Sequence, residues 1–203
     1  MRFDGSPVDQ PPPDPPADHG GGDGEPVEIP IPTWVISDTH LGHAGILDYC
    51  PWRQTWAATL AEHDAAILTA WRATVGPQDR VLHLGDLAMG DLRRLPELRQ
   101  QLPGRIVLVK GNHDPSGAKL RAAGFDLVVS AVSIQVGDHR WIARHNPGAF
   151  SLREARNAER LLHGHTHGNG YHDAIHPEVR RRVVDCSMDA LRNVAPIPWR
   201  NLR

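Results

Sequence analysis

The chain has 203 residues, with 22 Lys and Arg against 24 Asp and Glu and a formal net charge of -2. This length suffices for one ordinary core, and the balanced charge argues against bulk attraction to nucleic acid or membrane. No apolar run is long enough to span a bilayer, and the acidic, Pro-rich N-terminus lacks the apolar segment of a secretory signal. We therefore expect a soluble, cytoplasmic protein, in which Cys50 and Cys186 are reduced thiols.

Residues 1–30 differ in composition from the remainder of the chain. They include the stretch PPPDPPADHGGGDGEP, which has almost nothing to bury and many residues that interrupt helices and strands. A segment of this kind favours a disordered tail or tether. We expect the tail to end at residue 30 and one folded domain to occupy residues 31–203.

The first long helix is expected over residues 55–75, because Trp56, Leu60, Ile67 and Trp71 recur on one face. His63 falls on the same apolar stripe, which favours a buried structural histidine over a ligand. Two shorter helices are expected over 93–102 and 116–123.

Short apolar runs, typical of buried strands, alternate with these helices. In chain order they are residues 33–36, 81–84, 106–109, 132–136, 141–143, 161–162 and 183–184.

Five of these runs are followed by a short loop that contains Asp, His or Asn. The carboxyl ends of strands are where α/β proteins gather ligand-binding loops, so the five loops are expected to converge. The candidate ligands in them are Asp38, His40, Asp86, Asn112, His145, His165 and His167.

These seven candidates offer carboxylate, imidazole and amide groups but no thiolate, a set that suits Mn, Fe, Zn or Ni. They exceed what one catalytic ion needs, and they suit two ions that share a carboxylate. In an extended segment residues i and i+2 point the same way. Asp38 and His40 could therefore grip one ion together, and His165 and His167 could do likewise, with Gly164 letting the backbone approach.

A pair of ions roughly 3.5–4 Å apart clamps a phosphate and makes hydroxide available at neutral pH. The attacking group would then be a metal-bound water or hydroxide. His113, beside Asn112, is the best candidate to protonate the leaving oxygen, a contribution of about 10²–10⁴-fold in rate. Asp114 could hold its imidazole by a hydrogen bond.

The motifs DTH at 38–40, GD at 85–86, GNHD at 111–114 and GHTH at 164–167, with a lone His145, resemble the calcineurin-like metallophosphoesterase superfamily. The match in motif order covers residues 33–189 and is similar to small bacterial and phage members without a cap domain. Met89 stands where an Asn or Asp is common in the family, and Asn146 where an aromatic residue is common before proline.

The resemblance implies an α/β fold, a four-layer αββα sandwich of two mixed β-sheets flanked by helices, with residues 31–203 as the catalytic domain. Asp86 would bridge two ions, and His113 and Asp114 would be catalytic. His43 and Arg53 would contact the phosphate. One ion would bind Asp38, His40, Asp86 and His167, and the other Asp86, Asn112, His145 and His165.

We therefore expect hydrolysis of a small phosphomonoester or phosphodiester by in-line attack of activated water, with two divalent ions, Mn first and Fe, Zn or Ni as alternatives. A nuclease of the same superfamily and a catalytically inactive binding module are the alternatives. The missing basic patch disfavours nucleic acid other than a nucleotide substrate.

The remaining histidines are expected in the core or behind the ligands (His83, His163), or in the tail, loops and surface (His19, His139, His172, His176).

Overall fold

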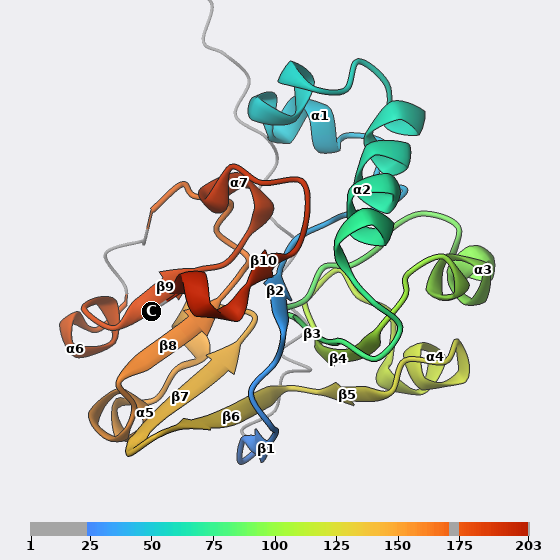
Figure 1. Ribbon diagram of the computed structural model, residues 1–203. Helices are drawn as coiled ribbons and strands as arrows, with labels where there is room; N and C mark the ends of the chain where they lie inside the picture. The colour runs from blue at the N-terminus through green and yellow to red at the C-terminus, as the bar shows by residue number, and fades with distance from the viewer. Residues whose placement is uncertain (1–23, 171–174, 203) are drawn as a thin grey trace, which may run out of the picture.

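The computed structural model describes residues 24–170 and 175–202, so the predictions for residues 1–23 and for His172 lie outside the described residues. Two five-stranded sheets form its centre (Figure 1). The first has the order β10-β2-β3-β4-β5, in which β10 is antiparallel to β2 and the other neighbours are parallel. Its strands are β2 (Trp34–Ile36), β3 (Arg80–His83), β4 (Arg105–Val109), β5 (Leu127–Val129) and β10 (Ile197–Pro198).

The second sheet has the order β1-β6-β7-β8-β9. Only the β6–β7 pair is antiparallel, and the other neighbours are parallel. Its strands are β1 (Val27–Glu28), β6 (Ala131–Val136), β7 (His139–Arg144), β8 (Arg160–His163) and β9 (Val183–Asp185). Both sheets are therefore mixed, as expected.

Helices lie on the outer side of each sheet (Figure 1). The first sheet is flanked by α2 (Leu60–Thr74), α3 (Leu95–Gln100) and α4 (Gly117–Ala122), and the second by α5 (Leu152–Asn157) and α6 (Pro177–Arg180). Two one-turn helices, α1 (Ile46–Tyr49) and α7 (Met188–Leu191), complete the α-helices of the described residues. The 3₁₀ segments are η1 (Pro51–Thr55), η2 (Leu92–Arg94), η3 (Pro147–Ala149) and η4 (Trp199–Leu202).

Three apolar clusters separate four layers. The first, around Trp71 and Leu120, packs helices on the first sheet. The second, around Leu82 and Trp141, lies between the sheets. The third, around Ala155, packs helices on the second sheet. The four-layer αββα sandwich is confirmed.

The alternation of β4 shows how the sequence builds these layers. Ile106 and Leu108 belong to the helix-facing cluster, whereas Val107 and Val109 belong to the cluster between the sheets. Successive strand residues point to opposite faces, so a strand buried on both sides reads as a continuous apolar run.

The first long helix begins later than predicted. Residues Pro51–Thr55 form a 3₁₀ helix, and α2 starts at Leu60. Thr59 accepts a hydrogen bond from the Glu62 amide, and the Glu62 carboxylate accepts one from the Thr59 amide; this capping box fixes the start of the helix. The helix predicted over 93–102 is likewise shorter: its start is the 3₁₀ segment η2 and its α-helical part is α3.

The predicted tail boundary at residue 30 is wrong in the structure. Val27 and Glu28 pair with β6 in the second sheet, and Ile29 is buried in the cluster between the sheets. The folded part therefore begins before residue 30. Across residues 24–170 and 175–202, no helix has the length and apolar character to cross a membrane.

Candidate metal centre

The loops that follow β2, β3, β4, β7 and β8 meet at one end of the two sheets. Backbone hydrogen bonds connect them: the Asp38 amide donates to the Gly85 carbonyl (3.0 Å), and the Gly164 amide donates to the His145 carbonyl (3.0 Å). The parallel order of these strands places their carboxyl ends together. The expected convergence of the five loops is present.

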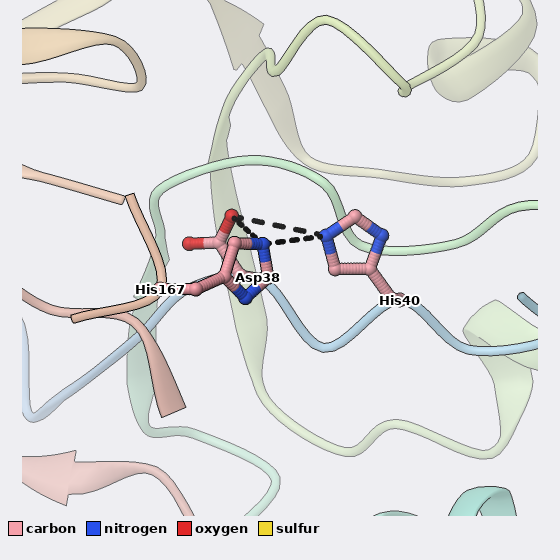
Figure 2. A group of neighbouring side chains, drawn as sticks. All are labelled: Asp38, His40 and His167. Carbon is pink, nitrogen blue, oxygen red and sulfur yellow. Dashed lines mark hydrogen bonds and ion pairs between the residues drawn. The ribbon is translucent and has the colours of Figure 1, made fainter. Parts of the chain in front are cut away.

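A first cluster consists of Asp38, His40 and His167, whose side chains point toward one another (Figure 2). His40 Nε2 lies 3.3 Å from His167 Nε2 and 3.9 Å from Asp38 Oδ1. His167 Nε2 lies 3.6 Å from Asp38 Oδ1. Asp38 and His40 follow β2, whereas His167 follows β8.

A second cluster consists of Asp86, His145 and His165, with Asn112 between the two rings. Asn112 Oδ1 lies 3.0 Å from His145 Nε2 and 3.0 Å from His165 Nδ1. His145 Nδ1 donates to the Leu84 carbonyl at 2.7 Å. This bond leaves His145 Nε2 directed toward Asp86 and Asn112.

Asp86 lies between the clusters. Its Oδ2 is 3.7 Å from His40 Nε2 in the first cluster and 3.3 Å from His145 Nε2 in the second. Its Oδ1 accepts the His113 amide at 2.9 Å. One carboxylate thus faces both sets of ligand atoms.

Among the described residues, six non-glycine residues have positive φ, and five of them are candidate ligands. These are Asp38, His40, Asp86, His165 and His167, with φ between 49° and 70°. The backbone at these i, i+2 pairs is therefore not extended as assumed, although Asp38 and His40 still lie in one cluster. His165 and His167 enter different clusters rather than gripping one position, because each turns sharply away from the strand direction.

Two glycines allow this close approach. A Cβ on Gly164 would collide with the side chains of Ser37 and Asp38, and one on Gly111 would collide with the Asp86 carboxylate. The expected role of Gly164 agrees with this geometry, and only glycine fits at either place.

The donor set fits divalent cations. Ligand atoms about 2.1 Å from a shared ion lie about 3.0–3.4 Å apart in octahedral or tetrahedral geometry. His40 and His167 are 3.3 Å apart at Nε2, and Asn112 Oδ1 is 3.0 Å from its two neighbours. Imidazole and carboxylate together suit Mn, Fe, Zn and Ni.

The buried charges perturb one another strongly. Burial disfavours a charged ring, but the Asp86 carboxylate outweighs it and raises the pKa of His145 to about 9. Burial raises the pKa of Asp38 to about 6, although the nearby rings of His167 and His145 oppose it. For Asp86, burial favours the neutral acid, yet the His145 ring holds its pKa well below the usual range. A cation that binds here must therefore displace protons.

His113 and His43 lie beside the first cluster. Each ring centroid is 5.6 Å from that of His40. Both residues are partly exposed, so a bound molecule could reach them.

Asp114 does not have the predicted arrangement. Its carboxylate accepts the amides of Asp86 (2.8 Å), Leu87 (2.9 Å) and Gly111 (2.8 Å), and the side chain is buried. A residue next in sequence to His113 is poorly placed to bond its ring, and three backbone amides compete for the carboxylate. Asp114 therefore connects the loop after β3 to the loop after β4.

Arg53 was predicted to contact phosphate, and this is wrong in the structure. Its side chain is 0% exposed and donates to the Asp189 carboxylate through Nε (3.0 Å) and Nη2 (2.7 Å). Sequence reasoning missed Asp189, which bonds His167 Nδ1 at 2.6 Å. No motif marks this Asp at the start of a one-turn helix.

The three histidines that the sequence predicts to lie in the core or behind the ligands are all buried. His63 is fully buried and bonded to Arg53 and Asp64. His83 is fully buried, accepts the Gly85 amide and contacts Thr39, and burial lowers its pKa to about 3. His163 is also buried, behind Gly164. Cys50 and Cys186 are free thiols.

A four-layer sandwich whose polar loops meet at the carboxyl ends of its strands defines a metallophosphoesterase-like α/β protein. The family model of the calcineurin-like phosphoesterase superfamily domain matches residues 33–183, and the chain belongs to this superfamily.

Proteins similar to this chain match it over most of their own length, and one solved structure matches it in fold. An uncharacterized protein of Methanocaldococcus jannaschii is 28% identical over 166 residues, which cover 81% of this chain and 85% of that protein. The Gene 66 protein of Mycobacterium phage L5 is 28% identical over 190 residues, covering 78% and 86%. A solved structure of a protein of unknown function from Aquifex aeolicus has a TM-score of 0.62 at 23% identity, covering 86% of this chain and 97% of that chain.

Proposed function

We propose that the protein is a metal-dependent phosphoesterase that hydrolyses a small phosphodiester or phosphomonoester with two divalent ions. Mn is the first candidate, and Fe, Zn and Ni are the alternatives. The position of Asp86 carries this proposal. One carboxylate oxygen lies 3.7 Å from His40 and 3.3 Å from His145, between two clusters of ligand atoms.

The ligands divide between two positions. Asp38, His40 and His167 would hold one ion and His145, His165 and Asn112 the other, with Asp86 shared. When bound, the ions would polarise the phosphoryl group and activate water for in-line attack. The protein supplies fixed ring orientations, as in His145, whose Nδ1 is tied to the Leu84 carbonyl.

His113 is the proposed proton donor to the leaving oxygen. Its backbone amide is bonded to Asp86 Oδ1, so its position is tied to the shared carboxylate. Its ring packs edge-on against His40 at a centroid distance of 5.6 Å, and the residue is partly exposed. His43, at the same distance from His40, is proposed to contact the phosphate. Asp114 supports this group through the backbone rather than through the His113 ring.

The test removes bound metal with a chelator and then titrates Mn, Zn, Ni and Mg while metal content is measured by mass spectrometry. Activity is followed with bis(p-nitrophenyl) phosphate, p-nitrophenyl phosphate and cyclic nucleotides. We expect two ions per chain at saturation and hydrolysis that requires them. His139→Ala serves as the control, because this histidine is 65% exposed at the far end of β7 from His145.

Two outcomes would contradict the proposal. A chain that binds no divalent ion would lack the metal centre altogether. A chain that binds two ions but hydrolyses none of the esters would instead favour a binding module with this fold.

A further inference from the structure

A side chain outside the set of candidate ligands forms a hydrogen bond with the ring nitrogen of His167 that does not face the first cluster. Its Nδ1 bonds Asp189 Oδ2 at 2.6 Å, and its Nε2 lies in the first cluster, 3.6 Å from Asp38 Oδ1. A carboxylate accepts, so Nδ1 carries the proton and Nε2 presents a lone pair to the cluster. Asp189 is only 6% exposed, at the start of α7.

Arg53 in turn holds Asp189. Its Nε donates to Asp189 Oδ1 and its Nη2 to Asp189 Oδ2. The same guanidinium donates to the carbonyls of Asp38 (2.5 Å) and Thr39 (3.1 Å). One buried cation therefore joins the segment after β2 to the helix that holds the histidine after β8.

The hydrogen-bonded chain extends beyond this pair. Arg53 Nη1 donates to His63 Nε2 at 3.0 Å, and His63 Nδ1 donates to Asp64 Oδ1 at 2.9 Å. The Asp64 carboxylate accepts the Gly42 amide at 3.0 Å, two residues after His40. The network begins and ends on segments that carry ligands of the first cluster.

Stability alone does not explain such a network. A buried ion pair is often no more stabilising than apolar side chains of the same volume, because both charges must leave water. The Arg53–Asp189 pair is buried at 0% and 6% exposure, and the guanidinium also donates to the Asp38 and Thr39 carbonyls in the segment that carries two candidate ligands. Orientation of the ligands is the property that this geometry provides and an apolar cluster could not.

A cation between Cys50, His167 and Asp189 is the competing explanation. These three offer ligand atoms near one another, with Cys50 Sγ 3.3 Å from His167 Nδ1. Both Asp189 oxygens already accept from Arg53, however, and the guanidinium supplies the positive charge that a metal would bring. The ion pair therefore takes the place of a third ion.

We propose that Asp189, held by Arg53, is a positioning residue that fixes the ring orientation and tautomer of His167 and so sets the affinity of the first cluster for a divalent cation. This inference rests on the proposed function. It adds a determinant that acts through His167 without touching the ion or the substrate.

Asp189→Asn is the informative substitution. The amide keeps the size of the carboxylate but replaces one acceptor oxygen with a donor, so it cannot serve His167 and both Arg53 nitrogens. Metal-stripped protein is titrated with Mn²⁺ by calorimetry. We expect one of the two binding steps to weaken about 10–100-fold, with the other step kept. Asp126→Asn is the control, because it breaks an Asp–Arg pair with Arg99 (3.0 Å) away from the centre.

A double-mutant cycle separates positioning from general destabilisation. In a His167→Ala background, Asp189→Asn should change Mn²⁺ affinity by less than about threefold, because its route of action is gone. An undiminished effect in that background would overturn the proposal. So would wild-type affinity in D189N, even if its metal-free melting temperature falls.

A second variant covers a folding failure of D189N. Arg53→Lys keeps the charge but cannot form the two parallel bonds, and it should weaken the same binding step. Unchanged affinity in R53K would overturn the role of Arg53. If the wild-type chain itself bound no Mn²⁺, the proposed function would fail first, whereas normal binding in both variants would refute only the positioning role.

Discussion

Replacing Asp114 by Ala should destabilise the fold by about 3–5 kcal/mol. The carboxylate accepts three backbone amides at 2.8–2.9 Å and is 6% exposed. Hydrogen bonds to a charged group contribute about 1.5–3 kcal/mol each, and their loss leaves three donors without a partner. Burial, and then the nearby Asp86 charge, raises the pKa of Asp114, so the carboxylate gains less than three independent bonds would give, and about 3–5 kcal/mol is the expected net loss.

The assay is thermal unfolding of metal-free protein by circular dichroism. For a domain of this size about 2–4 °C is lost per kcal/mol, so the melting temperature should fall by roughly 6–20 °C. Asp91→Ala is the matched control: this exposed carboxylate also accepts a backbone amide, that of Arg93, and should lose about 1 kcal/mol or less. A D114A protein that melts within 2 °C or so of wild type would refute the reasoning.

Four further predictions concern the centre and the N-terminal boundary. Asp86→Ala should abolish hydrolysis and empty or weaken both metal positions in metal analysis, since both clusters lose their shared ligand. His113→Ala should cut kcat by about 10²–10⁴-fold at nearly full metal content, and loss of metal would contradict its role. Gly164→Ala should lower metal uptake and the melting temperature together, and wild-type values would contradict the tight packing. Deleting residues 1–30 should cost about 2–4 kcal/mol in denaturant unfolding, because buried Ile29 and β1 are lost, whereas deleting residues 1–20 removes none of these contacts.

The layers of the fold follow from patterns visible in the sequence. Runs such as Ile106–Val109 are apolar at every position because each face of the strand meets a different cluster. The strand at Val27–Glu28 was not predicted, because two exposed residues carry no periodic signal and their order depends on pairing with β6. Local capping, through Thr59, also overrode the apolar stripe in placing the start of α2.

The sequence predicts the loops that carry the candidate ligands, but it does not predict the side chains that hold those ligands in place. Motif order brought the right side chains to one end of the sheets, because strand ends and loops are local features. The partner of Arg53 lies 136 residues away in Asp189, and the choice between phosphate and that carboxylate is decided only by tertiary packing. The hydrogen-bond partners of Asp114 cannot be predicted for the same reason, because they are backbone amides, which have no sequence signature.

The positive φ angles at five candidate ligands lower the stability of the fold at the positions that the proposed function needs. A non-glycine residue held at such an angle costs of order 1–3 kcal/mol, so the five together cost at least about 5 kcal/mol. Ordinary domains have only about 5–15 kcal/mol of net stability. Glycine at Asp38 or His165 would relax the chain while deleting a ligand. Laboratory evolution under selection for thermal stability alone should therefore favour glycine at these positions and yield variants that are more stable but inactive.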